Sequence, residues 1–216
     1  MTSPAPRTCR NRSRWYPPGR LYDLAFGGIL RSIRRSVEAA VTTDDLFPWL
    51  DVCSGTGSQL RGLDQEPDGR TAIGLDLHPG MIRYAAARAP GLAFVRGDAA
   101  ALPFKAGVFM AVSVTLGLHD KDPEIRAAMM EEAKRVMASD GRFVAVDFET
   151  PWGRGSRFGS LFARAIERTA GGAHYANGRD FLRRGGLKEF LKESGFAEVA
   201  RRDIATGSIA VVVSRI

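Results

Sequence analysis

From Phe47 onward, short runs of apolar residues alternate with longer stretches in which apolar residues recur at helical spacing. Short apolar runs bounded by turn residues are typical of buried strands, and the helical spacing is typical of amphipathic helices. Strands are expected at residues 49–53, 71–75, 92–95, 108–114 and 142–148, with helices just after Gly57 and at 79–89 and 123–138. Strands that alternate with helices form parallel βαβ units, so the pattern predicts a doubly wound α/β sheet.

The predicted helix at 123–138 has clear boundaries. Asp122 stands at its N-cap position and Pro123 at its first helical position, where a missing N–H leaves no bond unmade. Residues 139–141, Ser-Asp-Gly, are expected to end the helix and turn the chain into the next strand.

The chain before Phe47 divides into two parts. Residues 1–20 combine four prolines with scattered arginines and predict a basic, flexible arm. Residues 21–41 carry apolar side chains at helical spacing and predict an amphipathic helix. We therefore expect a single folded domain over residues 21–216.

The last third of the chain has a different pattern. Residues 154–170 predict a basic amphipathic helix, and the glycine-rich residues 171–186 predict an irregular segment. A helix and two strands are expected to follow, at 187–194, 197–203 and 208–214. Only residues 204–207 separate the two strands, too few for a parallel crossover, so the last strand must run antiparallel to its neighbour.

The composition is that of one ordinary globular domain. The chain has 216 residues, of which 44% are hydrophobic and 25% charged. No apolar run is long enough for a membrane span, and the first twenty residues lack the apolar block of a secretory signal, so a cytoplasmic protein is expected. An organellar transit peptide is the alternative interpretation of the arginine-rich arm. Cys9 and Cys53 have no disulfide or metal-binding spacing, so we expect reduced thiols and no metal site.

The net charge of +7 comes from two segments. Residues 1–20 hold five Arg and no acid, and residues 151–184 hold seven Arg against Glu167 and Asp180. One interpretation is a solvated surface, and the other is a surface for an anionic acceptor or an anionic membrane. The sequence contains no RNA- or DNA-binding motif, so no nucleic-acid partner is expected.

A glycine-rich turn follows the first predicted strand. The segment Leu50-Asp-Val-Cys-Ser-Gly-Thr-Gly57 joins that strand to the next helix. Gly55 and Gly57 allow the backbone to bend tightly and to approach a ligand closely. A tight turn that binds nothing has the same composition, so this segment alone does not establish a ligand.

Two carboxylates follow the next two predicted strands. Asp76 lies 19 residues after Gly57, where dinucleotide-binding folds carry the acid that accepts the ribose hydroxyls; alternatively, it caps the next helix. Asp98 is placed to accept from an adenine amino group, beside the backbone N–H of Ala99; alternatively, it caps its own loop. Because the carboxyl ends of parallel strands meet at one edge, the three features together predict a ligand with a ribose and an adenine. NAD and S-adenosylmethionine both satisfy this prediction.

Glu131-Glu-Ala-Lys-Arg-Val136, Gly141-Arg-Phe-Val144 and the closing helix, glycine and two strands complete a recurring order of motifs. In this order, the chain resembles the class I S-adenosylmethionine-dependent methyltransferases. The resemblance implies a Rossmann-like, doubly wound, seven-stranded sheet, mostly parallel with an antiparallel last strand, and S-adenosylmethionine as cofactor. The cofactor-binding residues that it implies are Tyr22, Asp51, Cys53, Ser54, Gly55, Gly57, Asp76, Leu77, Met81, Asp98, Ala99, Thr115 and Leu116.

Several stretches resemble the ubiquinone- and menaquinone-biosynthesis enzymes of the type 11-like methyltransferases. They are Tyr22-Asp23, residues 114–118, residues 147–151 and residues 206–211. The resemblance implies a small-molecule or lipid-like, quinone-type acceptor, with residues 151–186 as an insertion or lid on the substrate side. Cys53 stands where the family usually has its first glycine, and residues 174–186 do not match the quinone enzymes, so a different acceptor stays open.

Methyl transfer from a sulfonium is an in-line displacement with an excellent leaving group. Alignment and water exclusion therefore dominate catalysis, and a general base is needed only when the acceptor loses a proton. The candidates for that role are His119, His174 and Tyr175, each of which is also interpretable as an ordinary loop residue. One alternative function is a non-catalytic S-adenosylmethionine-binding regulator. The other is an NAD-dependent oxidoreductase, which the closing antiparallel strands and residues 131–136 argue against. The sequence predicts no particular oligomeric state.

Overall fold

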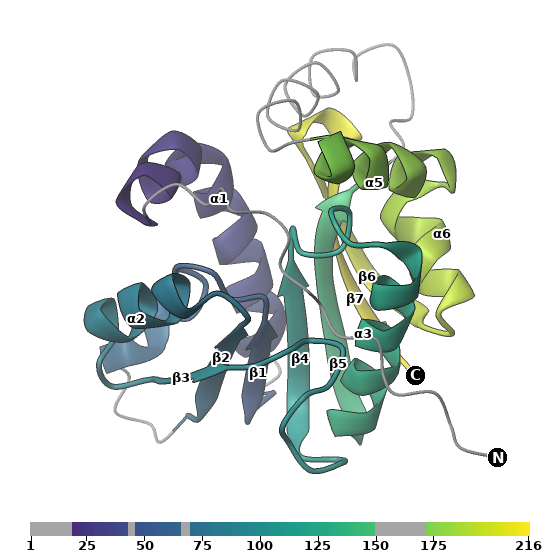
Figure 1. Cartoon of the computed structure of the whole chain (residues 1–216). Helices are drawn as coiled ribbons and strands as arrows, with labels where there is room; N and C mark the ends of the chain where they lie inside the picture. Colours follow the sequence, from purple (N-terminus) through teal and green to yellow (C-terminus); the bar gives the residue numbers. More distant parts are fainter. Residues whose placement is uncertain (1–18, 43–45, 66–69, 150–171) are drawn as a thin grey trace, which may run out of the picture.

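A seven-stranded sheet with helices on both faces forms the molecule (Figure 1). The computed structural model describes residues 19–42, 46–65, 70–149 and 172–216. The strands are β1 Trp49–Val52, β2 Ala72–Asp76, β3 Ala93–Arg96, β4 Phe109–Thr115, β5 Met137–Phe148, β6 Ala197–Ile204 and β7 Ile209–Arg215, in the spatial order β3-β2-β1-β4-β5-β7-β6. Strands β1 to β5 pair in parallel, and β7 is antiparallel to both β5 and β6. The predicted Rossmann-like sheet with an antiparallel last strand is confirmed.

The helices occupy the crossovers and the two ends of the described chain. They are α1 Gly19–Thr42, α2 Pro79–Arg88, α3 Pro123–Val136, α5 Gly172–Arg183 and α6 Gly186–Glu193, with 3-10 turns η1 at Arg61–Gln65 and η3 at Ala205–Gly207. None of the helices in these described segments is long and apolar enough to cross a membrane.

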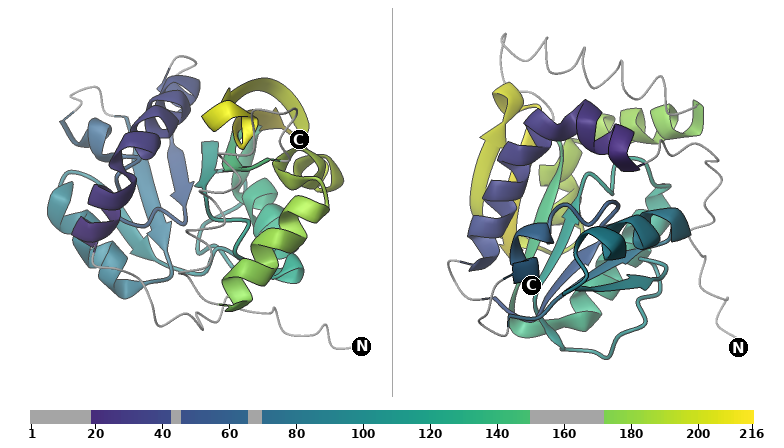
Figure 2. Two further views of the ribbon diagram at one scale, coloured as in Figure 1. Left: turned by 90° about the horizontal axis from the view of Figure 1, so that it is seen from above. Right: turned by 90° about the vertical axis from the view of Figure 1, so that its left-hand side faces the viewer.

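Alternate residues of the central strands supply two separate hydrophobic cores. On β4 and β5, Val112 and Phe143 belong to the core under α3 and α6, whereas Ala111 and Val144 belong to the core under α1. Helices α1 and α3 therefore lie on opposite faces of the sheet, which Figure 2 shows from above and from one side. This period-two alternation is the reason that these strands are apolar almost throughout.

The expected end of the helix at 123–138 is wrong, and so is the capping bond that was expected at its start. Helix α3 ends at Val136 and β5 already begins at Met137, so residues 139–141 lie inside the strand. Met137 pairs with Phe109, and Arg142 pairs with Ala111. The register of the two strands shifts between these pairs, so the residues that were expected to form a turn are accommodated within β5. Asp122 is at the N-cap as predicted, but its carboxylate accepts from Asn177 Nδ2 at 3.0 Å and makes no capping bond.

The glycine-rich segment 171–186 was expected to be irregular, and this is also wrong. Residues 172–183 form α5, which lies above the carboxyl ends of β4 and β5 (Figure 1). Gly178 and Phe181 are buried, so the helix is packed against the body of the molecule. The predicted basic arm, apart from its last two residues, and the predicted helix at 154–170 lie outside the described residues.

Candidate functional site

The glycine-rich turn leaves β1 at the carboxyl edge of the sheet. Cys53, Gly55 and Gly57 all have positive φ, at 59°, 53° and 68°. A Cβ on Gly57 would lie 2.7 Å from the ring of Phe94 and 2.8 Å from the Cβ of Ala85, so no side chain fits there. Cys53 holds a side chain in a left-handed conformation, which costs about 1 kcal/mol. The turn is thus tightly packed on its inner side and strained at its first residue.

Asp76, at the end of β2, connects the turns that follow the first three strands. Its Oδ2 accepts from the backbone N–H of Gly55 at 2.9 Å, and its Oδ1 accepts from that of His78 at 2.8 Å. Its backbone carbonyl accepts from Gly97 N at 3.1 Å, which brings the loop after β3 against β2. Each carboxylate oxygen has two lone pairs, so Asp76 retains the capacity to accept from ribose hydroxyls.

The cap of α2 is His78, which the sequence analysis did not single out. Its Nδ1 accepts from Gly80 N at 3.2 Å and from Met81 N at 3.3 Å. The interpretation of Asp76 as a helix cap is therefore wrong. Met81 itself is buried on α2, and the carbonyl of Leu77 accepts from Arg96 Nε at 3.4 Å.

Asp98 and Ala99 lie in the loop after β3. Asp98 Oδ1 accepts from Ala100 N at 2.9 Å, so the carboxylate does cap its own loop. Ala99 is buried. Because Gly97 bonds to Asp76, this loop lies beside the proposed ribose-binding acid, as the sequence predicted.

Asp51 is a buried acid beneath the turn. Ser113 Oγ donates to Asp51 Oδ1 at 2.6 Å and accepts from Trp49 Nε1 at 2.8 Å. Burial raises the pKa of the Asp51 carboxyl to about 7; the hydrogen bond from Ser113 opposes this shift and the charge of Asp76 adds to it. Ser54 is also buried, and its N–H donates to the carbonyl of Leu75 at 2.9 Å.

The loop after β4 packs against the turn. Thr115 ends the strand, and Leu116 has a φ of 53° and donates its N–H to Val146 O at 2.7 Å. A Cβ on Gly117 would lie 3.0 Å from Cys53 Cβ and 3.3 Å from Cys53 Sγ, so the loop touches the turn at this point. The turn after β1 and the loop after β4, which both carry predicted residues, are thereby brought together.

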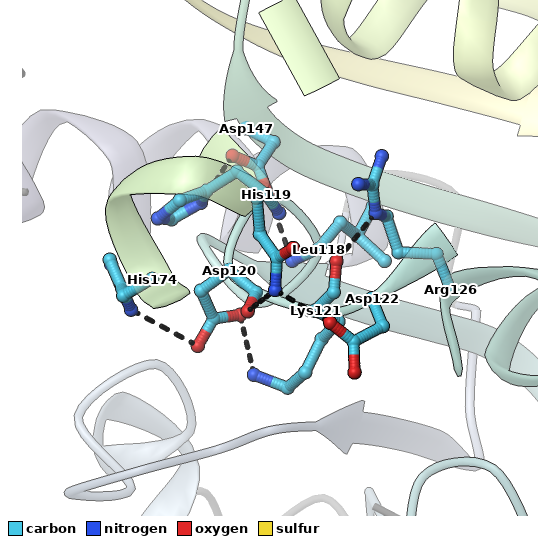
Figure 3. Close-up of polar contacts among 9 residues, drawn as sticks. Leu118, His119, Asp120, Lys121, Asp122, Arg126, Asp147 and His174 are labelled. Carbon is cyan, nitrogen blue, oxygen red and sulfur yellow. Dashed lines mark hydrogen bonds and ion pairs between the residues drawn. The ribbon is translucent and has the colours of Figure 1, made fainter. Parts of the chain in front are cut away.

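His119 forms a buried pair with Asp147 at the end of β5 (Figure 3). The distance from His119 Nδ1 to Asp147 Oδ1 is 2.7 Å, and Asp147 has no exposed surface. Burial alone would lower the pKa of the His119 imidazole, but the charge of Asp147 and the hydrogen bond to it outweigh burial, so the pKa is raised. His119 is not a loop histidine bonded only to backbone groups.

His174 on α5 lies beside His119, although 55 residues separate them in the sequence. The two ring centroids are 5.4 Å apart in an edge-to-face arrangement, and His174 Nδ1 is 3.7 Å from Asp120 Oδ2. Burial lowers the pKa of His174, and the charge of Asp120 offsets this only in part. Tyr175 instead lies under the guanidinium of Arg179, whose Cζ is 5.6 Å from the ring centroid.

Two residues of the site were missed from the sequence. Asp147 is a charged residue in the otherwise apolar run Val144–Phe148, and Ser113 is a hydroxyl in the middle of a buried strand. A polar residue in such a run is the feature that could have identified them. Tyr22 lies on α1, but its side chain is outside the described part of the structure. No cluster suited to a metal ion occurs among the residues that the structure describes.

Comparison with known proteins defines the family. Residues 50–141 match the methyltransferase domain family. The chain is 32% identical over 176 residues to a demethylmenaquinone methyltransferase of Beutenbergia cavernae, an alignment that covers 75% of this chain and 70% of the relative. The chain belongs to the class I S-adenosylmethionine-dependent methyltransferases. It is therefore an S-adenosylmethionine-dependent enzyme and not an NAD-dependent oxidoreductase.

Solved structures show the same fold for this methyltransferase. The PH0226 protein of Pyrococcus horikoshii has a TM-score of 0.62 at 17% identity, with 90% of this chain and 98% of that chain covered. Magnesium protoporphyrin IX methyltransferase of Synechocystis, solved with bound S-adenosylhomocysteine, has a TM-score of 0.59 at 19% identity, with 86% and 83% covered.

Proposed function

We propose that this methyltransferase transfers a methyl group from S-adenosylmethionine to the hydroxylated ring of a quinol-type acceptor. The observation that carries the proposal is the 32% identity to an enzyme named demethylmenaquinone methyltransferase, over 70% of its length. The loop after β4 supports it, because this loop packs on the turn of residues 51–57 and carries His119, which pairs with Asp147 of β5.

We further infer that the cofactor lies along the carboxyl ends of β1, β2 and β3. The ribose would bind Asp76, and the adenine would lie at Asp98 and Ala99, beside Leu77 and Met81. The methionine part would lie over the turn of residues 51–57 and against Thr115 and Leu116, and a cationic cofactor there would favour the ionised form of Asp51, whose pKa is about 7 without it. Tyr22 is proposed to cover this end of the site.

The acceptor is tested with a demethylmenaquinone that carries one prenyl unit. The purified enzyme is incubated with S-adenosylmethionine and either the reduced quinol or the oxidised quinone, and the products are analysed by mass spectrometry. We expect one methyl group on the quinol and none on the quinone, because only the quinol ring is electron-rich. If neither form is methylated while S-adenosylhomocysteine binds, the acceptor is of another class.

The cofactor placement is tested by Asp76→Ala. A hydrogen bond to a charged group contributes about 1.5–3 kcal/mol, so the affinity for S-adenosylhomocysteine should fall roughly ten- to a hundred-fold in calorimetric titration. Asp140→Ala is the matched control, because Asp140 is an exposed acid near the amino end of β5. Equal affinities of Asp76→Ala and the parent would contradict this placement.

The predicted membrane contact stays a prediction. Most of the basic residues on which it rests lie outside the described residues, although Arg179 and Arg183 are exposed on α5. Co-sedimentation with vesicles that contain or lack anionic lipid would measure it, and binding is expected only to the anionic vesicles.

A further inference from the structure

Asp147 fixes both the backbone and the side chain of the loop after β4. It accepts four hydrogen bonds: Oδ2 accepts from the N–H groups of Leu118 and His119, at 2.9 and 3.2 Å, and Oδ1 accepts from His119 Nδ1 and Phe148 N, both at 2.7 Å. A carboxylate that is fully buried and fully hydrogen-bonded cannot move without breaking several bonds. The loop and the imidazole are therefore held in one arrangement.

This arrangement determines which nitrogen of His119 carries the proton. A carboxylate only accepts, so Nδ1 must be the donor in the 2.7 Å contact, and in the neutral ring Nε2 is then unprotonated. Among the described residues, no hydrogen bond reaches Nε2. The ring is held by edge contacts with Phe148 and His174, with centroid distances of 4.6 and 5.4 Å (Figure 3 shows His119, Asp147 and His174).

The charges around His119 favour its protonation. Burial lowers the pKa of His119 and Lys121 adds to this, but Asp147 on β5 and Asp120 on the same loop together outweigh them, so the pKa is raised. On α5, His174 contacts the ring, and burial lowers the pKa of His174, so it does not compete for the proton as a second cation. Within this cluster of described residues, His119 is the stronger base.

The pair also lies next to the cofactor turn. Gly117, two residues before His119, packs against Cys53, and Leu116 is bonded to Val146, the residue before Asp147. The turn, the loop and the carboxylate therefore lie next to one another at the carboxyl ends of β1, β4 and β5. A group on this loop is positioned to act on an acceptor that faces the cofactor.

We propose that His119, oriented by Asp147, is the general base that takes a proton from a ring hydroxyl of the acceptor. The proposal rests on the quinol-type acceptor above and restricts it to rings with an ionisable hydroxyl beside the methylated carbon. The hydroxyl proton passes to His119 Nε2, the oxygen electron pair moves into the ring, and the adjacent carbon bonds to the methyl carbon, which leaves its former bonding pair on sulfur. The hydrogen of that ring carbon then moves to the oxygen as a proton, so the acceptor loses one proton in all.

His119→Asn is the decisive variant. The Asn amide keeps a donor near the position of Nδ1, so the bond to Asp147 and the loop are preserved, while Nε2 is lost. With the one-prenyl demethylmenaquinol as probe, kcat/KM at pH 8 should fall roughly 10²–10⁴-fold, the usual contribution of a general base. The affinity for S-adenosylhomocysteine should stay within about threefold, because the cofactor contacts are unchanged.

The pH profile separates a catalytic from a structural role. In the parent, kcat/KM should rise with pH until His119 is neutral, and this rise should be absent in His119→Asn. Asp147→Asn should lower kcat/KM as well, because an amide no longer stabilises the imidazolium; Asp140→Asn on the same strand is the matched control and should behave as the parent. A low rate in His119→Asn with the pH-dependent rise retained would mean that the histidine only supports the loop, and would overturn the proposal.

A measurement without acceptor separates this proposal from that of the acceptor. In ¹⁵N spectra of the imidazoles, His119, identified by its absence from His119→Asn, should carry its proton on Nδ1 and titrate above the usual histidine range. The tautomer is determined at a pH at which the ring is neutral, and a neutral ring with its proton on Nε2 would overturn the role of His119 whatever the acceptor is. If instead the parent fails to methylate the quinol, the acceptor class is wrong, and the role of His119 as base for that acceptor is withdrawn with it.

Discussion

The two halves of the sheet edge are built in different ways. Around β1, β2 and β3, the proposed cofactor site is assembled mostly from backbone N–H groups, of Gly55, His78 and Gly97, that meet the single residue Asp76. Around β4 and β5, the loop is held by the buried side chains of Asp147 and Arg126, and Arg126 in turn pairs with the partly exposed Asp180 of α5. The region around β1, β2 and β3, here called the cofactor half, can keep its geometry while most of its side chains change. The region around β4 and β5, here called the acceptor half, depends on its side chains, so substitutions there change its chemistry.

This difference matches the demands on the two halves. The cofactor is the same throughout a methyltransferase family, and a site made of backbone groups and one acid can bind it without other particular side chains. The acceptor differs between enzymes, and the proposed role of the His119–Asp147 pair would adapt the proton chemistry to it. The following predictions test whether the two halves are separable.

The largest effect is expected at Asp51, because its buried carboxyl reduces stability. Its pKa is about 7 in the fold against an ordinary 3.8, so the favourable contribution of the neutral acid is complete below pH 4 and is lost as the pH rises through 7. Asp51→Asn cannot ionise and can still accept from Ser113. At pH 8, the ligand-free variant should be more stable than the parent by up to about 4 kcal/mol, measured by urea unfolding.

The pH dependence supplies the control for Asp51→Asn. Its advantage in the free energy of unfolding should shrink steadily as the pH is lowered from 8 to 4, while its affinity for S-adenosylmethionine at pH 8 should be weaker than that of the parent. An advantage that does not change with pH would show that Asp51 is ionised or solvated throughout. The proposed cofactor site around β1, β2 and β3 would then not lower the stability of the ligand-free protein.

The second prediction compares two glycines of the same turn. Gly55 and Gly57 both have positive φ, but a Cβ on Gly55 meets nothing within 4 Å, whereas one on Gly57 meets Phe94 and Ala85 below 3 Å. Gly55→Ala should cost about 1 kcal/mol from backbone conformation alone. Gly57→Ala should cost about 3 kcal/mol or more, because overpacking adds to the same conformational cost.

Thermal unfolding measures the difference between these variants. For a chain of this length, the melting temperature should fall by about 2–4 °C in Gly55→Ala and by about 6–12 °C in Gly57→Ala. Equal losses would mean that backbone conformation alone, and not the packing of the turn on α2 and β3, sets its geometry. The stability of the His119 loop should be the same in both variants, as hydrogen exchange would show.

The sequence predicted the sheet well, and it placed the residues of the proposed cofactor site at the ends of adjacent strands, for a physical reason. Hydrophobic alternation and the position of Gly55, Gly57 and Asp76 at strand ends depend on neighbours close in the sequence or on adjacent parallel strands. Helix α5 was missed because its stability comes from elsewhere: Phe181 is buried, and Asn177 Nδ2 donates to Asp120 O and to Asp122. Such tertiary contacts override the low helix propensity of its glycines.

The acceptor half could be predicted only residue by residue. His119 and His174 were candidates individually, but nothing in the sequence indicates that α5 brings them side by side. The partner of His119 was missed because Asp147 lies 28 residues away, and their contact depends on the parallel register of β4 on β5. A charged residue within a buried strand shows that a partner is needed, but it does not show which one.

The last and smallest effect tests the acceptor half through Arg126, which joins α3, the His119 loop and α5. Its Nε donates to Lys121 O at 2.8 Å, its Nη2 to Asp180 at 3.2 Å, and its guanidinium lies over the ring of Phe181. Arg126→Met keeps the packing on Phe181 but removes the bonds, so it should cost about 2 kcal/mol and speed hydrogen exchange in α5.

Arg184→Met is the matched control, because Arg184 pairs with the same carboxylate of Asp180. The side chain of Arg184 is 61% exposed, whereas that of Arg126 is 2% exposed, so the exposed pair should contribute less than about 0.5 kcal/mol. In both variants, the affinity for S-adenosylhomocysteine should equal that of the parent, because no contact of Arg126 reaches the proposed cofactor residues. A tenfold loss of that affinity in Arg126→Met would mean that the loop after β4 transmits strain through Gly117 to Cys53, and that the two halves of the edge act as one site.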